Sequence, residues 1–161
     1  MRKKADKVLI LNIKNGGIDD LFNELREEYH ESIPRSPHIT IYGPYKCFKN
    51  RIIEKTKDII NNISIEIDDI DIFEFNEQFF CVFKVKAPRL KEIWKKPDFP
   101  QKKYGFNPHI TLYRGNKETA ITIKKKVKSI KNIFNLSIMS NEIEIKKSII
   151  GQRELPLDLR Q

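Results

Sequence analysis

Two short segments of the chain have almost the same sequence, and both carry side chains that can transfer protons. Residues 37–42 read PHITIY and residues 108–113 read PHITLY, so five of the six positions are identical. Two of the three histidines occupy the matching second position, and the third, His30, has no counterpart. A duplicated strand kept only for packing would explain the aliphatic residues but not the repeated His and Thr. We therefore predict that the two segments form one functional site.

Each segment is β-branched and bounded by Pro or Gly, as is typical of a strand. Strand side chains alternate between two faces, so the His, Thr and Tyr of a segment share one face and the aliphatic residues share the other. The aliphatic face is expected to lie in a hydrophobic layer under helices. The predicted polar rows are His38, Thr40 and Tyr42 in the first segment and His109, Thr111 and Tyr113 in the second.

Two opposed imidazoles with hydroxyl groups beside them suit cleavage of a phosphodiester. One group must take a proton from the attacking oxygen and another must give one to the leaving oxygen, and histidine does either near neutral pH. A Thr hydroxyl can donate a hydrogen bond to a non-bridging phosphate oxygen, where charge develops in the transition state. A Tyr can stack on a base or ribose, or donate a hydrogen bond to the phosphate. The nearly identical segments do not say which histidine is the acid.

Other residues near the segments could bind phosphate. Arg114 follows the second segment, and Arg35 precedes His38 by three residues. A guanidinium can bind phosphate through a bidentate pair of hydrogen bonds. In a regular strand Arg114 would point away from the Tyr113 face, so a surface ion pair is an equal alternative. Weaker candidates are the loop residues Lys46, Lys102 and Lys103.

The elements that must position these residues follow from hydrophobic periodicity. Five apolar side chains fall on one helical stripe: Ile18, Leu21, Phe22, Leu25 and Tyr29. The first half is predicted to contain strands over residues 7–14, 36–42 and 64–75, with helices over about 18–29 and 52–60. The second half repeats this order with strands over 79–86 and 107–113, a short helix from Pro88, a helix over 117–131, an alternating segment over 134–138 and a closing strand over 143–149.

This internal repeat predicts an α+β fold. The expected architecture is one bilobal domain over residues 1–161, with pseudo-symmetric half-lobes at about 1–76 and 77–161 and antiparallel sheets around a central cleft. The long irregular stretch from Lys95 to Lys103 could cover that cleft.

The composition fits one folded domain with an anionic partner. The chain has 161 residues, 39% of them hydrophobic, and a formal net charge of +9. A composition rich in Lys, Ile and Asn also follows from an AT-rich genome, so charge alone does not decide. The lysines of residues 124–128 (KKKVK) are predicted to be a solvated helix face rather than a nucleic-acid groove. No apolar run reaches the roughly 18 residues of a membrane span, and no signal peptide is predicted, so a cytoplasmic location is expected.

Other chemistries lack support in the sequence. Asp68, Asp69 and Asp71 have no further ligand type nearby and are expected in a strand bulge or a loop, so no metal or other cofactor is predicted. Phosphate-cradling glycine loops and Gly-x-Ser-x-Gly are absent from the sequence. Cys47 and Cys81 are predicted to be buried free thiols.

Two His-x-Thr motifs, each after a Pro on a predicted strand and about 70 residues apart, resemble those of the 2H phosphoesterase superfamily. That superfamily includes 2′-5′ RNA ligase-like proteins and cyclic nucleotide phosphodiesterases. The resemblance covers nearly the whole chain in element order and is specific at the motifs. It implies a two-lobed fold and metal-independent chemistry, with His38 and His109 as acid and base and Thr40 and Thr111 as phosphate-binding hydroxyls.

The implied partners are nucleotides. Candidate substrates are 2′,3′-cyclic phosphate ends, 2′-5′ linked oligonucleotides and cyclic oligonucleotides, with no membrane and no obligate protein partner. A different class of function is also open: the same cleft could sequester a nucleotide or an RNA end without turnover, or be the remnant of a lost activity.

Overall fold

The computed structural model describes residues 7–95, 105–130 and 132–149. Its strands are β1 (Lys7–Ile13), β2 (His38–Tyr45), β3 (Ser64–Phe75), β4 (Gln78–Lys86), β5 (His109–Gly115), β6 (Ser137–Met139) and β7 (Ile143–Ile149). The α-helices are α1 (Gly16–Tyr29), α2 (Asn50–Asn61) and α4 (Lys117–Lys128), and the 3₁₀ turns are η1 (His30–Ser32), η2 (Pro88–Glu92) and η3 (Ser140–Glu142). The chain is therefore an α+β protein, as the sequence predicts.

The strands form one continuous sheet in the order β6-β3-β4-β5-β2-β1-β7, with antiparallel neighbours throughout. The expectation of separate sheets is therefore wrong. The last long strand of each half pairs with the other half, since β3 lies beside β4 and β7 beside β1. A two-residue turn explains the first of these pairings: Asn76 and Glu77 both have positive φ, the conformation that folds two strands back on each other.

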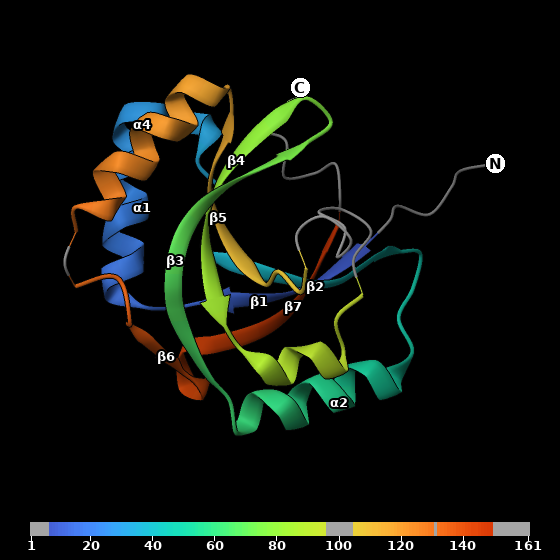
Figure 1. The fold of residues 1–161 in the computed structure, drawn as a ribbon. Coiled ribbons are helices and arrows are strands. Elements are labelled where there is room, and N and C mark those ends of the chain that lie inside the picture. Colours follow the sequence, from blue (N-terminus) through green and yellow to red (C-terminus); the bar gives the residue numbers. More distant parts are fainter. Residues whose placement is uncertain (1–6, 96–104, 131, 150–161) are drawn as a thin grey trace.

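The two halves meet at the pair Ile39 and Ile110, where β2 and β5 join the sheet. These residues occupy the same position in the two motifs. Beyond Ile39, Lys95 replaces β5 as the partner of β2: its N–H donates to Ile41 and its carbonyl accepts from Gly43. In Figure 1, β3, β4 and β5 accordingly run across the direction of β1, β2 and β7.

The two halves also share one pairing register. Four consecutive residues of β1 face β2 as four consecutive residues of β4 face β5, and each series skips one residue of the partner strand. The matching pairs are Leu9↔Tyr42 and Cys81↔Tyr113, Ile10↔Thr40 and Val82↔Thr111, Leu11↔Ile39 and Phe83↔Ile110, and Asn12↔His38 and Lys84↔His109. The repeat is thus a repeat of hydrogen-bonding partners as well as of sequence.

The main core lies between the helices and one face of the sheet, which we call the helix face. It contains the predicted apolar stripe of α1, and α4 contributes Ala120, Ile123 and Val127. The aliphatic residues of both motifs are fully buried in it: Ile39, Ile41, Ile110 and Leu112. Burying each such side chain stabilises the fold by about 1.5–3 kcal/mol, so this layer fixes which face of β2 and β5 points away from it. That opposite face, which carries His38 and His109, is called the motif face.

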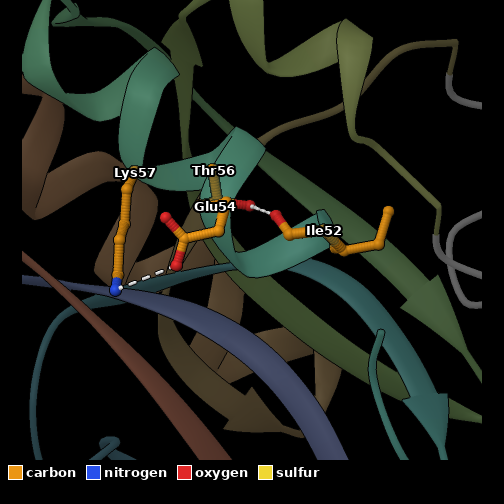
Figure 2. A network of polar contacts seen from close by, with 4 residues as sticks. All are labelled: Ile52, Glu54, Thr56 and Lys57. Atoms are coloured by element: carbon orange, nitrogen blue, oxygen red, sulfur yellow. Dashed lines mark hydrogen bonds and ion pairs between the residues drawn. The ribbon is translucent and has the colours of Figure 1, made fainter. Parts of the chain in front are cut away.

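Helix α2 lies below β1 and β7 in Figure 1 and contributes side chains to the core. It also buries one hydroxyl, that of Thr56, and supplies its hydrogen-bond acceptor. Thr56 is fully buried, and its hydroxyl donates to the carbonyl of Ile52 at 2.7 Å. Figure 2 shows this bond between neighbouring turns of α2, together with the ion pair of Lys57 and Glu54, whose side chains are exposed. The internal bond lets α2 present Thr56 to the core without an unpaired polar atom.

The lysines of α4 lie on a solvated face that is partly neutralised by neighbouring acids. Lys124 pairs with Asp71 of β3 at 3.9 Å, and Lys126 pairs with Glu24 and Glu28 of α1 at 3.2 and 3.8 Å. Figure 1 shows α1 and α4 side by side. These pairs are consistent with the predicted solvated face.

The second half follows the predicted element pattern with small differences. The short helix predicted from Pro88 is the 3₁₀ helix η2, and α4 ends at Lys128, with Ser129 as its C-cap. Residue 131, the predicted end of that helix, lies outside the described residues. Of the alternating segment over 134–138, only the last two residues lie in a strand, β6 (Ser137–Met139). The predicted bulge in β3 is confirmed, between Ile67 and Asp69.

Nothing among the described helices is both long and apolar enough to cross a bilayer.

The two cysteines lie in different surroundings. Cys81 is fully buried on β4, as predicted, and this burial raises its pKa to about 12. Cys47 is exposed, so the prediction of a buried thiol is wrong there. It follows the end of β2, where the neighbouring Phe48, and not the thiol, packs against the core.

We predict that one thiol per chain reacts with an aromatic disulfide reagent in the native protein at pH 8, and two react in denaturant. The thiolate is the nucleophile, and the raised pKa of Cys81 keeps its thiol protonated at that pH. A Cys47→Ser variant is the control and should lose the native reaction. Two fast-reacting thiols in the native wild type would contradict the buried position of Cys81.

Candidate active site

A β-bulge lies at the same place in both motifs. Ile41 in β2 and Leu112 in β5 are the residues skipped in the pairing with the neighbouring strand. A bulge inserts one extra residue, so the side chains beyond it change faces relative to a regular strand. The predicted rows of three polar side chains are therefore cut after Thr40 and Thr111.

The placement predicted for the two tyrosines is wrong for this reason. Tyr113 lies in the core on the helix face, 3% exposed, with its ring 6.1 Å from that of Tyr29. Its hydroxyl accepts a hydrogen bond from the N–H of Asn116 at 3.0 Å, just before α4. A Cβ atom at Gly115 would collide with this hydroxyl, which explains the glycine that closes the motif.

Tyr42 moves in the same way. It pairs with the core residue Leu9 of β1 and packs partly against the core. Its ring lies 5.0 Å from that of Tyr45 and 5.6 Å from that of Phe48. Both tyrosines thus pack on the helix face of the motif strands and do not lie beside the His and Thr side chains of the motif face.

The same bulge brings Arg114 onto the motif face. Arg114 pairs with Phe80 of β4, whereas Tyr113 pairs with Cys81 in the core. Phe80 packs against a second apolar cluster formed by Phe73 and Val82. Val82 in turn pairs with Thr111, so Arg114 and Thr111 share a face. The expectation that Arg114 points away from the polar row is therefore wrong.

Both histidines are anchored in the same manner. The Nδ1 atom of His38 lies 2.9 Å from the carbonyl oxygen of Ser36, and that of His109 lies 2.6 Å from the carbonyl oxygen of Asn107. A carbonyl oxygen only accepts, so Nδ1 carries the hydrogen in each ring. In the neutral ring the lone pair is then on Nε2, which is the atom able to take a proton.

The Pro before each histidine helps to fix this anchor. A residue before Pro is held in an extended conformation, and this sets the direction of the Ser36 and Asn107 carbonyls. The Pro carbonyls are themselves tied to the neighbouring strands: Pro37 accepts from Ile13 at 3.0 Å and Pro108 from Val85 at 3.2 Å.

The two histidines lie close together on one face. Each precedes one member of the Ile39–Ile110 pair. Paired antiparallel Cα atoms are about 4.5–5.5 Å apart and successive ones 3.8 Å, so the Cα atoms of His38 and His109 lie within about 13 Å of each other. Two imidazole side chains can contact one phosphate group across that span. His109 is the more enclosed, at 6% exposure, with its ring edge-to-face 5.1 Å from Phe73.

The motif threonines stand on the same face with their hydroxyls available. Thr40 and Thr111 are half-buried. Neither hydroxyl makes a hydrogen bond to the part of the chain that the structure describes. By contrast, the hydroxyls of Thr56 and Thr122 both donate to carbonyls four residues earlier. A hydroxyl that is half-buried and not used internally can donate to a bound oxyanion.

Two residues on the motif face were missed by the sequence analysis. Asn12 of β1 pairs with His38, and Lys84 of β4 pairs with His109, so each lies directly beside a histidine. Lys84 is half-buried and makes no ion pair within the described segments. The carboxylate opposite it, Asp69, accepts instead from the N–H of Ile70. Only the strand register identifies these neighbours, because nothing in the local sequence marks them.

The remaining candidates lie at the edge of this site or beyond it. Arg35 is exposed in the turn before β2, and its carbonyl accepts from Arg26. Lys46 is exposed just after β2. Lys102, Lys103 and most of the stretch expected to cover the cleft lie outside the described residues.

A scan against protein-family models finds no match, and neither the curated proteins nor the solved structures include one that is significantly similar to this chain.

Replacing Tyr113 by Phe is expected to lower the free energy of unfolding by about 1 kcal/mol, because the Asn116 N–H loses its acceptor in a partly buried hydrogen bond. Urea denaturation measures the change. Tyr45→Phe is the matched control, since no hydrogen bond to its hydroxyl occurs among the described residues, and its stability should not change. Equal stability of Tyr113→Phe and wild type would contradict a structural role for this hydroxyl.

Proposed function

We propose that the protein is a phosphodiesterase that cleaves a nucleotide phosphodiester by general acid and base catalysis with two histidines. The observation that carries the proposal is the paired anchoring of His38 and His109: both rings are held through Nδ1 to the carbonyl two residues earlier, on one face of one sheet. Half-buried Thr hydroxyls beside them favour an oxyanion as the ligand.

We further propose that the two halves are related by a pseudo-two-fold axis through the Ile39–Ile110 pair. The matching registers and the matching bulges at Ile41 and Leu112 support it. A site on such an axis would lie in a cleft between two lobes, with one His-x-Thr motif on each side of the phosphate.

The reaction requires one neutral and one protonated imidazole. The neutral ring takes a proton at Nε2 from the attacking oxygen, which belongs to water or a ribose hydroxyl and forms the new bond to phosphorus. The other ring gives its Nε2 proton to the leaving oxygen as the old phosphorus–oxygen bond breaks. Thr40 and Thr111 donate to the non-bridging oxygens, and Lys84 and Arg114 offset the charge that develops there.

The substrate class follows from this chemistry together with the resemblance to 2H phosphoesterases. Candidates are 2′,3′-cyclic phosphate ends, 2′-5′ linked oligonucleotides and cyclic oligonucleotides, cleaved without a metal ion. The same face also fits a protein that binds such a ligand and does not turn it over. Activity measurements separate these two functions.

His38→Ala and His109→Ala are each expected to lower kcat by about 10²–10⁴-fold on a cleaved substrate, since each removes a proton-transfer group. A panel of the three candidate substrates, assayed in EDTA, measures the loss. His30→Ala is the matched control, because His30 lies at the end of α1 with no counterpart in the motifs, and it should keep full activity. The mechanism would be contradicted by activity that remains in the variant carrying both His38→Ala and His109→Ala, or by activity that EDTA abolishes.

Arg114→Ala and Lys84→Ala are each expected to lower kcat/KM by about 10- to 100-fold, because each removes a charged partner of the phosphate. Arg114→Lys should recover part of the loss in kcat/KM, because lysine restores the positive charge but not the bidentate hydrogen bonding. Arg89→Ala is the control, since Arg89 pairs with Glu92 on the surface of η2. Unchanged kcat/KM in both alanine variants would remove these residues from the site.

A further inference from the structure

The two halves of the motif face differ in charge at matched positions. Asn12 stands beside His38 where Lys84 stands beside His109. Gly43 follows the first motif where Arg114 follows the second, and a Cβ atom at Gly43 would lie 2.8 Å from the carbonyl oxygen of Lys7. Lys84 and Arg114 therefore both belong to the second half, and the first half has a neutral amide and a glycine in their place.

The amide of Asn12 carries a buried acceptor that the described part of the chain leaves unpaired. Its Oδ1 atom is shielded from solvent and has no hydrogen-bond partner among the described residues. The neighbour on one side, His38, uses its Nδ1–H on Ser36. On the other side Glu144 of β7 is an acceptor as well.

Glu144 cannot supply the missing donor. Lys14 and Lys146 each lie 3.4 Å from its carboxylate. The hydrogen bond and charge of Lys14, aided by Lys146, hold the pKa of Glu144 below its ordinary value. The carboxylate is thus ionised near neutral pH and only accepts.

An unpaired buried acceptor costs free energy, and a ligand that donates to it recovers that cost on binding. Asn12 and His38 are cross-strand partners, and the Cβ atoms of such partners are about 4.5–5.5 Å apart. A ligand that donates a hydrogen bond to Asn12 is therefore the same ligand that contacts His38. Lys84 and Arg114 draw the phosphate charge toward the second half. The part of a nucleotide diester left for Asn12 is the ribose next to the phosphate, whose donor is a hydroxyl.

We propose that Asn12 is a specificity residue whose Oδ1 accepts a hydrogen bond from the free ribose hydroxyl vicinal to the esterified oxygen. This inference rests on the proposed function and narrows its substrate class. A 2′,3′-cyclic phosphate has both vicinal oxygens esterified and offers no such donor. An internal ribose diester keeps one hydroxyl free, the 3′-hydroxyl in a 2′-5′ linkage, so internal diesters are the preferred ligands.

The test compares the affinities of adenylyl-(2′-5′)-adenosine and its analogue that lacks the 3′-hydroxyl at the linkage. Affinity is measured by calorimetry in a His109→Ala background, because the free hydroxyl could also be the attacking group and its removal would then abolish turnover whatever Asn12 does. The hydroxyl-bearing ligand should bind about 10- to 100-fold more tightly. Adding Asn12→Leu should bring this ratio close to one.

Two further variants separate this role from others. Lys84→Gln, at the matched position of the other half, should weaken both ligands and keep their ratio. Asn12→Asp retains the acceptor and should keep the affinity ratio of the two ligands, although its negative charge weakens the binding of both. Asn12→Leu should also raise the melting temperature, since it removes a buried unpaired polar atom.

The outcomes distinguish the inference from the proposed function. The inference is overturned if the two ligands bind equally well to the His109→Ala protein that retains Asn12. It is also overturned if the hydroxyl-bearing ligand still binds more tightly after Asn12→Leu is added. Turnover of the 2′,3′-cyclic phosphate alone, lost in His38→Ala, overturns the inference and leaves the phosphodiesterase standing. Absence of any turnover that depends on the histidines overturns both.

Discussion

The antiparallel pairing of Ile39 with Ile110 is the contact on which the candidate site depends. Both residues are fully buried under the helices, so the hydrophobic effect fixes their orientation. Because side chains alternate along a strand, the residue before each isoleucine must point to the other face. His38 and His109 are therefore brought to one face, close together, by a pair of residues that do no chemistry.

The bulges at Ile41 and Leu112 decide which other side chains join the histidines. One extra residue in each strand turns Tyr113 into the core, where its hydroxyl supports the start of α4, and brings Arg114 to the motif face. An aromatic row suited to stacking is thereby exchanged for a cation suited to phosphate. Both bulges come after the threonines, so ordinary alternation keeps Thr40 and Thr111 on the side of the histidines.

The two halves share one strand register around the motifs, and a few side chains at matched positions differ. The anchors of His38 and His109 match atom for atom, which suits a reaction that needs an acid and a base of the same kind. Asn12 and Lys84 do not match, and neither do Gly43 and Arg114. The phosphodiester proposed as the substrate is itself asymmetric, because its reaction has an attacking and a leaving oxygen, so unlike side chains at matched positions would favour one orientation of it.

The sequence by itself determined the local features: the helical stripe of α1, the motif strands, and the shared face of His38 with Thr40 and of His109 with Thr111. These follow from periodicity and from the burial of aliphatic residues, which act over a few neighbouring positions. Only the tertiary structure decided the single sheet, the bulges, the direction of Arg114, and the neighbours Asn12 and Lys84. Strand order and register depend on hydrogen bonds between segments far apart in the chain, and a shift of one residue reverses every side chain beyond it.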